Sequence, residues 1–340
     1  MVFLRKLKTK DYFSVGVSAL KVKLGKKVPL RVTFIATNAC NLRCRYCYAE
    51  DYDKRKAMDT QEVKDMMKEF KYLGTKVWKF GGGEPLLRGD IEELIDYGIK
   101  LGFIVNIDTN GTFVAKKIHI LKKLDNVQIS IDGPRELHDS IRGEGVFDKC
   151  IEALRLLNEN GIKPLINCVI SEANLDNIEN MVELARMHNA FINFQPIVPV
   201  TEEAKEMMSK KLIENNVFNR ILFLKKKYDF IAVSENSLKR FQDYYSGRID
   251  RFQEKKCLAG QIYCIVSPQG EVARCIGELG RKNVPGKEQG FGKAMNQLSD
   301  DYSCDCTFCN FRDMSELYSL KPTVVLRSVK NLKNGKWIYN

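Results

Sequence analysis

Residues 30–47 read LRVTFIATNACNLRCRYC, a β-rich run that leads directly into three closely spaced cysteines. The first eight residues are rich in β-branched and aromatic side chains, which favours a buried strand. Cys40, Cys44 and Cys47 follow in the spacing Cys-x3-Cys-x2-Cys. The stretch therefore predicts a strand whose carboxyl end opens into a loop that carries three thiols.

Short β-rich runs alternate with helical segments from this strand onward. The predicted strands are 30–37, 76–80, 103–108, 127–131, 164–170 and 191–195, and the predicted helices are 60–73, 91–102, 114–124, 147–160, 175–188 and 202–227. Such a series predicts a parallel sheet with crossover helices. Six units are too few to close an eight-unit barrel. We therefore expect an α/β fold, a partial (β/α)6 TIM-type barrel with an open side.

The pattern changes after residue 233. Residues 234–256 are polar and are expected to be helical, whereas residues 257–310 hold six cysteines. Within them, residues 267–270 (SPQG) predict a tight turn in a small hairpin. We expect four parts: a basic N-terminal lead-in (1–29), a core barrel (30–233), a small cysteine-rich α+β domain (234–320) and a basic C-terminal tail (321–340).

The positive charge of the 340-residue chain is concentrated at its ends. The net charge is +12; residues 1–31 hold nine Lys or Arg and one acid, and residues 321–340 hold five and none, so the central 289 residues net −1. Nucleic-acid enzymes carry their cations around the active site, so nucleic acid is not an expected partner. Basic ends suit either solubilising tails or a loose contact with RNA, an anionic membrane surface or an acidic partner.

No apolar run is long enough to span a membrane, and no secretory signal is evident, so we expect a cytoplasmic protein. Residues 12–24 interleave apolar residues with lysines, which fits peripheral contact with a membrane surface. The same pattern fits an ordinary helix packed under the barrel.

Eleven cysteines in a cytoplasmic protein point to metal binding, because disulfides are rare in that compartment. Histidine is scarce, with three in the chain. Three thiolates on one loop can hold three corners of a 4Fe–4S cube and leave the fourth iron open to another ligand. A structural zinc would need a fourth protein ligand, and no His lies near the loop.

Polar or glycine-rich residues end three further predicted strands: Gly81–Pro85, Asp108–Gly111 and Ser130–Gly133. The carboxyl ends of parallel strands meet at one edge, where such folds place their chemistry. We therefore expect these segments to surround the cysteine loop.

The Cys-x3-Cys-x-aromatic-Cys loop, with Tyr46 as the aromatic, and the Gly-Gly-Glu-Pro at residues 82–85 resemble the radical S-adenosylmethionine (SAM) superfamily over roughly residues 30–230. The resemblance implies that Cys40, Cys44 and Cys47 hold a 4Fe–4S cluster whose open iron binds the amino and carboxylate groups of SAM.

The resemblance also implies SAM-binding residues. Gly82, Gly83 and Glu84 would hold the amino group of SAM and Tyr46 would lie beside its adenine. Ser130 and Asp132 would reach the ribose or the amino-acid end, Arg142 would pair with the carboxylate, and Asn174 would contact the adenosine. A surface ion pair for Arg142 and a helix cap for Asn174 are the structural alternatives.

The implied reaction is reductive cleavage of SAM to a 5′-deoxyadenosyl radical, which takes a hydrogen atom from a substrate. It requires an external one-electron donor such as flavodoxin or ferredoxin, and its oxidisable clusters suit an anaerobic setting. The sequence names no general base. The alternative class is a non-enzymatic iron–sulfur or zinc carrier.

The second cysteine set resembles the SPASM and shortened twitch auxiliary-cluster domains found in this superfamily. Its six cysteines are too few for two fully ligated cubes, so the resemblance implies one auxiliary 4Fe–4S cluster. The expected ligands are Cys257, Cys275, Cys306 and Cys309, with Cys264 as a possible replacement and Cys304 as the spare. A structural zinc on the same thiolates is the alternative.

The substrate is left open by the resemblance. Relatives with such a domain modify peptides, mature sulfatases, oxidise sugars or build cofactors, and some relatives with a basic-apolar N-terminal lead-in act on isoprenoids or other lipids. A small molecule, a lipid and a peptide are all compatible with the sequence, and the segment before the first strand is short for a peptide-recognition domain.

Overall fold

The computed structural model describes residues 17–299 apart from 19, 23, 48–55, 199–200, 208–211, 213–215 and 249–256. The C-terminal tail, Cys304, Cys306 and Cys309, and most of the N-terminal lead-in therefore lie outside the described residues. Among the described helices, none is both long and apolar enough to cross a lipid bilayer.

The described residues form one nine-stranded sheet, in the order β6-β5-β4-β3-β2-β1-β7-β8-β9. Its strands are β1 (Arg31–Thr37), β2 (Val77–Gly82), β3 (Ile104–Thr109), β4 (Asn126–Ser130), β5 (Leu165–Ile170), β6 (Phe191–Pro196), β7 (Tyr263–Val266), β8 (Glu271–Ala273) and β9 (Val284–Pro285). Strands β1 to β7 pair in parallel, and β8 and β9 are antiparallel. Since β6 and β9 are the two outer strands of the order, the sheet is open, and the predicted partial barrel is confirmed.

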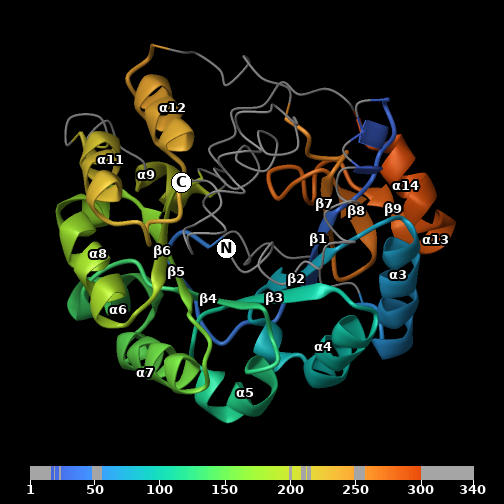
Figure 1. Cartoon of the computed structure of the whole chain (residues 1–340), viewed down its shortest axis with the longest axis horizontal. Helices are drawn as coiled ribbons and strands as arrows, with labels where there is room; N and C mark the ends of the chain where they lie inside the picture. Colours follow the sequence, from blue (N-terminus) through green and yellow to red (C-terminus); the bar gives the residue numbers. More distant parts are fainter. Residues whose placement is uncertain are drawn as a thin grey trace.

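Helices cover the outer side of the curved sheet, as Figure 1 shows for α3 through α8. The bounds are α3 (Thr60–Tyr72), α4 (Ile91–Lys100), α5 (Val114–Leu121), α6 (Arg135–Arg142), α7 (Val146–Glu159), α8 (Ile178–Met187), α9 (Glu202–Glu206), α11 (Val217–Lys227), α12 (Glu235–Tyr245), α13 (Gly286–Gln289) and α14 (Phe291–Gln297), with short 3-10 turns η2 (Pro85–Leu87) and η3 (Glu172–Asn177).

Local signals set several helix ends. Asp59 forms a capping box with Glu62 at the start of α3, which satisfies backbone N–H groups of the first turn. Gly102 and Gly161 follow α4 and α7 with φ of +75° and +76°, a conformation that glycine adopts without strain. The predicted helix 202–227 differs from the structure, which has α9 and α11 there. Helix α6 was missed because its sequence, RELHDSIR, holds only two apolar residues.

The two faces of the sheet carry different residues. On β1, Val32, Phe34 and Ala36 are buried against the helices, whereas the alternate residues Arg31 and Thr33 face the inner side and line a pocket. This is the period of two that a pleated strand imposes. The same alternation runs through β2 to β5, so the sheet has an apolar outer face and a largely polar inner face.

Strand β7 lies beside β1, with Arg31 opposite Tyr263 and Phe34 opposite Val266. The described part of the cysteine-rich segment therefore continues the barrel sheet, and the four-part division of the chain stays a prediction. The pairing has a physical reason, because β1 would otherwise present unpaired N–H and C=O groups along a sheet edge.

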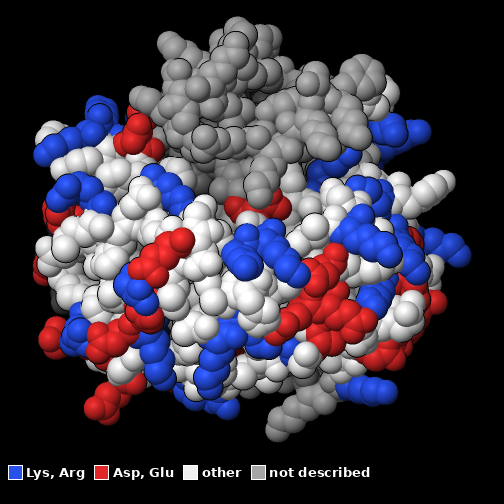
Figure 2. All heavy atoms as spheres, turned by 60° about the horizontal axis from the view of Figure 1, so that its bottom comes forward, with Lys and Arg blue, Asp and Glu red and all other residues white. Residues whose placement is uncertain are grey.

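The outer face carries charges of both signs. Figure 2 shows lysines and arginines interspersed with acids over this side of the described residues. Many are partners on one helix, such as Arg155 with Glu152 and Glu159, or on neighbouring helices, such as Lys117 with Glu92. Exposed pairs of this kind contribute little to stability but keep the surface mixed in sign.

Candidate active site

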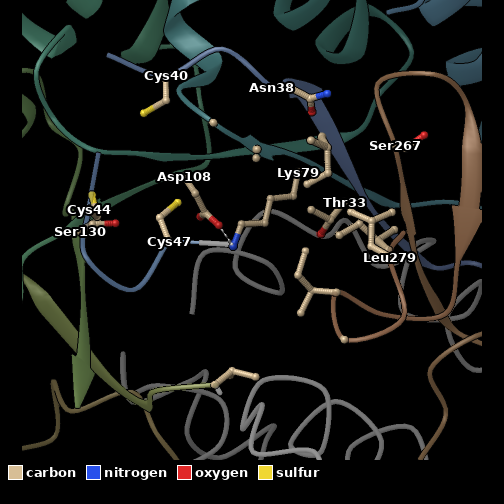
Figure 3. A pocket seen from close by; sticks show the side chains of 18 of the residues that line it. Thr33, Asn38, Cys40, Cys44, Cys47, Lys79, Asp108, Ser130, Ser267 and Leu279 are labelled. Atoms are coloured by element: carbon tan, nitrogen blue, oxygen red, sulfur yellow. Dashed lines mark ion pairs between the residues drawn. The ribbon is translucent and has the colours of Figure 1, made fainter. Parts of the chain in front are cut away.

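A pocket of about 870 Å³ occupies the inner side of the sheet. Cys40, Cys44 and Cys47 lie along its wall together with residues from the ends of the strands, and Figure 3 shows these three thiols with Ser130 and Asp108 around one space. The volume is in the range of small-molecule sites. The structure thus brings the cysteine loop and the strand ends together, as the sequence predicted.

The glycine turn after β2 holds the cysteine loop in place. The N–H of Gly83 donates to Thr37 O at 2.9 Å, and the N–H of Glu84 donates to Ala39 O at 2.8 Å. A Cβ on Gly83 would lie 2.3 Å from Ala39 O, and a Cβ on Gly82, whose φ is +123°, would lie 2.6 Å from Thr37 O. Both glycines line the pocket, but their lack of a side chain is required by the loop backbone packed against them.

Glu84 is fully buried behind the pocket wall. Its carboxylate accepts hydrogen bonds from the Thr109 hydroxyl at 2.8 Å, the Asn110 N–H at 2.8 Å and the Leu86 N–H at 3.1 Å. Burial raises its pKa to about 7 although these donors oppose the shift. In this structure Glu84 joins the turn after β2 to the turn after β3; its predicted contact with SAM stays a prediction.

Asn110 is a pocket residue that the sequence analysis did not select. Its amide donates to Asn41 Oδ1 at 3.0 Å and lies 3.9 Å from the Cys40 sulfur. The Asp-Thr-Asn-Gly run after β3 was the available signal, but a turn sequence does not say which side chain faces the loop.

A buried network ties the other end of the cysteine loop to β4 and α6. Arg142 Nε donates to Asp132 Oδ2 at 2.6 Å, the Tyr46 hydroxyl donates to the same oxygen at 2.7 Å, and Arg142 also donates to the Tyr46 oxygen. Arg142 Nη1 lies 3.8 Å from the Cys44 sulfur. The structure therefore brings three predicted site residues together around a thiol.

Burial and the charge of Arg142 together set the pKa values of Asp132 and Cys44 in this network. Burial would raise the pKa of Asp132, yet the Arg142 guanidinium overcomes it and lowers that pKa below the usual value. Burial raises the pKa of the Cys44 thiol to about 11, and Arg142 opposes the increase. The Arg142 charge therefore favours the Cys44 thiolate that a metal requires.

Ser130 and Asn174 occupy different places. Ser130 faces the pocket. Asn174 is buried at η3, where its amide donates to Asp132 O and Val169 O at 2.7 Å each and its carbonyl accepts from Ser171 N–H. These bonds cap the turn and join it to β4 and β5, which corresponds to the structural alternative for Asn174.

The middle of the pocket holds an ion pair that sequence reasoning missed. Lys79 Nζ lies 2.5 Å from Asp108 Oδ2, and both residues line the pocket with Arg31. Figure 3 shows the pair projecting between the cysteines and Thr33. A charged residue inside a β-rich run is more often exposed, so the pattern alone did not reveal a polar barrel interior.

The described part of the second cysteine set divides into two environments. Cys257 and Cys275 pack against one small cluster with Ile262 and Tyr263. Cys264 is fully buried in the main core, and burial raises its pKa far above the usual range. The segment after Cys275 contributes Ile276 to Gly277 and Leu279 to Arg281 to the pocket wall.

The three thiols of the first loop all line one pocket, and three thiolates are the donor set that three corners of a 4Fe–4S cube require. Among the described residues no three Cys, His, Asp or Glu side chains are gathered closely enough to hold one metal ion. A single zinc draws its thiolates to about 2.3 Å from one centre. A 4Fe–4S cube binds each thiolate through a different iron, so its ligands stand farther apart around a wider space. Three thiols around one pocket therefore suit three corners of the cube.

Comparison with known proteins agrees with this chemistry. Residues 34–185 match the Radical SAM superfamily. The chain is 27% identical over 265 residues to mycofactocin maturase MftC of Mycolicibacterium smegmatis, covering 74% of this chain and 65% of that protein. It is 28% identical over 270 residues to the AdoMet-dependent heme synthase of Oleidesulfovibrio alaskensis, covering 72% and 69%.

Among solved structures, SuiB of Streptococcus suis bound to its precursor peptide SuiA superposes with a TM-score of 0.64 at 19% identity, covering 82% of this chain and 67% of that one. This likeness concerns the fold. The match to MftC spans somewhat less than two thirds of that protein's length. The sequence match, the cysteine loop and the open barrel together identify residues 34–185 as a radical SAM domain.

Proposed function

We propose that this protein is a radical SAM enzyme that modifies a peptide. One observation carries the proposal: Cys40, Cys44 and Cys47 line the same pocket as Gly81–Gly83, Asn110 and Arg142 at the carboxyl ends of the strands. The chemistry that a 4Fe–4S cluster and SAM supply together is a one-electron cleavage that yields a carbon radical able to take hydrogen from an unactivated C–H bond.

The chain's own residues would bind and orient these groups. The three cysteines would hold the cluster, and Gly82 and Gly83 would offer backbone polar groups to the amino-acid end of SAM. Arg142 is positioned by Asp132 and Tyr46 beside the loop, where its charge favours the Cys44 thiolate.

A peptide substrate is supported by the inner wall. Gln128, Asn167 and Gln195 stand on the successive strands β4, β5 and β6 and all line the pocket. Primary amides both donate and accept hydrogen bonds, as peptide groups do, so this row suits a peptide segment. SuiB, which shares the fold, was solved with a peptide bound.

A tetrapyrrole substrate is the second candidate. It is supported by the 28% identity to an AdoMet-dependent heme synthase over most of this chain. Cations on the inner wall, Arg31 and Lys79, would suit the carboxylates of such a molecule.

We also propose one auxiliary 4Fe–4S cluster on Cys257, Cys275, Cys306 and Cys309. The two described members share one cluster of packed residues, and Cys264 lies in a different environment. A flavodoxin or ferredoxin would deliver the first electron.

The test is anaerobic reconstitution followed by iron analysis and a dithionite-driven SAM cleavage assay. We expect about eight irons per chain, falling to about four in the Cys40→Ala/Cys44→Ala/Cys47→Ala variant, with 5′-deoxyadenosine formation lost. Cys168→Ala is the matched control, because Cys168 lies on β5 in the core and not at the pocket. SAM cleavage by the triple variant would refute the proposal. So would a loss of SAM cleavage in Cys168→Ala that the triple variant does not show.

A further inference from the structure

A buried histidine and a buried cysteine lie together in the core, next to the ends of β3 and β4. His138 is on α6, Cys150 is on α7, and neither side chain is exposed. His138 Nε2 lies 3.8 Å from Cys150 Sγ. Polar atoms in a core cost free energy unless they have hydrogen-bond partners, so the partners of this pair indicate its purpose.

The histidine holds the segment that follows β4. The Asp132 N–H donates to His138 Nδ1 at 3.2 Å, so this nitrogen carries no hydrogen. Burial lowers the pKa of His138 to about 4, and the ring is therefore neutral at pH 7 with its hydrogen on Nε2, which faces Cys150. Asp132 Oδ2 accepts from Arg142 Nε, and Arg142 Nη1 lies 3.8 Å from the Cys44 sulfur. The histidine thus fixes the backbone to which the donor beside Cys44 is attached.

The cysteine holds the segment that follows β3. Burial raises the pKa of Cys150 to about 12, so the thiol keeps its hydrogen at neutral pH. Its S–H donates to Asn110 O at 3.2 Å. This close approach depends on Gly111, because a Cβ at that position would lie 3.1 Å from the Cys150 sulfur. The Asn110 side-chain amide then lies 3.9 Å from the Cys40 sulfur.

The pair therefore connects two polar groups that face different thiols of the cysteine loop. The Asn110 amide lies beside Cys40, and the Arg142 guanidinium lies beside Cys44. Hydrogen bonds to the sulfurs are among the factors that set the reduction potential of an iron–sulfur cluster. Such donors stabilise the more negative, reduced cluster, so groups that hold them close raise the potential.

We propose that His138 and Cys150 are positioning residues for the two donors that face the thiols, and that they thereby raise the reduction potential of the cluster. The proposal rests on the proposed function, since it concerns the cluster of the same site. The pair acts through the backbones of Asn110 and Asp132. Without it, each segment loses a polar contact, and the donors move away from the sulfurs.

The experiment is a redox titration of the anaerobically reconstituted full chain, followed by electron paramagnetic resonance. The signal that is missing from the triple alanine variant of the cysteine loop belongs to the cluster of that loop. Cys150→Ala removes the S–H donor, and His138→Phe removes both ring nitrogens at similar size. We expect a lower reduction potential in each variant than in the wild type.

Conservative variants test whether the polar contacts are responsible. Cys150→Ser keeps a donor for Asn110 O, and His138→Asn keeps an acceptor for the Asp132 N–H. Both should restore most of the wild-type potential. If His138→Phe does not fold, the serine and alanine variants of Cys150 decide alone, because they differ by one weak donor in the core.

Leu154→Ala is the control for a loss of stability. Leu154 is fully buried one turn after Cys150 on α7, so its truncation should lower the melting temperature without removing a polar contact. We expect the potential of Leu154→Ala to equal that of the wild type. A wild-type potential in Cys150→Ala, or an equal fall of the potential in Leu154→Ala, would overturn the proposal.

The wild type separates the two proposals. If it forms the cluster but does not cleave SAM, the proposed function is wrong, and the potentials of the variants still decide on the pair. If it cleaves SAM and Cys150→Ala keeps the wild-type potential, the proposed function stands and the positioning role is wrong. If it forms no cluster at the loop, both proposals are wrong.

Discussion

The outer and inner faces of the same strands are built for different purposes. Trp78 and Lys79 are neighbours on β2, yet Trp78 is fully buried among aromatic rings and Lys79 projects into the pocket. The outer face is continuous with the main core, whereas the inner face holds charges and amides that line the pocket. The difference teaches that stability and chemistry are carried by alternate residues of one segment.

The largest expected effect on stability comes from the outer face. Trp78 stacks on Phe103 with a centroid distance of 5.5 Å and packs edge-on to Phe70 at 5.9 Å. Trp78→Ala should lower the free energy of unfolding by about 3–5 kcal/mol, because it removes a large buried side chain and leaves a cavity.

Gln128→Ala on the inner face is the matched comparison, since Gln128 lies at the pocket on the neighbouring part of the sheet. Its cost should be under about 1 kcal/mol. Chemical denaturation of both variants measures the contrast. Equal losses would show that the inner face contributes as much to the core as the outer face.

The Asp132–Arg142 pair should be an exception to this contrast between the two faces. It lies beside the cysteine loop, yet both side chains are buried. Asp132→Ala leaves the Arg142 charge buried without its carboxylate, and we expect a loss of about 3 kcal/mol at pH 7. The pKa of Asp132 is lowered in the folded state. Its contribution is therefore present above the unfolded pKa near 4 and is lost as pH falls below it. Denaturation curves at pH 7 and pH 3 should show the variant and the wild type converging at the lower pH.

A smaller effect on the free energy of unfolding is expected at Glu84, where stability falls as pH rises rather than as pH falls. Its folded pKa of about 7 lies above the ordinary value of 4.5, so the folded state holds a proton that the unfolded state releases. Stability is then lost as pH rises from about 4.5 to 7, by roughly 2–3 kcal/mol. In Glu84→Gln this slope should disappear. A wild-type curve that is flat over the same range, or one that keeps its slope in the variant, would contradict this reading of the buried carboxyl.

The sequence predicted the outer face well and the inner face poorly. The six strands of the barrel and the cysteine loop followed from periodicity, spacing and resemblance, because β-branched runs and repeated thiols leave strong local patterns. Lys79 and its ion pair with Asp108 were missed because only the curvature of the sheet turns a charged position inside a strand into a pocket wall. The orientation of the Glu84 side chain could not be predicted from the sequence for a similar reason. The Gly-Gly-Glu-Pro motif places Glu84 beside the cysteine loop, but it does not show which N–H and O–H groups donate to its carboxylate.

The pairing of β1 with β7 has a consequence for synthesis on the ribosome. Arg31 and its neighbour Tyr263 are separated by more than two hundred residues of chain. At about 5–20 residues per second, the β1 edge waits roughly 10–50 s for its partner to be made. Such late, long-range pairing slows folding and leaves an exposed edge open to aggregation in the meantime. The nascent chain is therefore most in need of a chaperone before β7 emerges, when the cysteine loop beside that edge already exists.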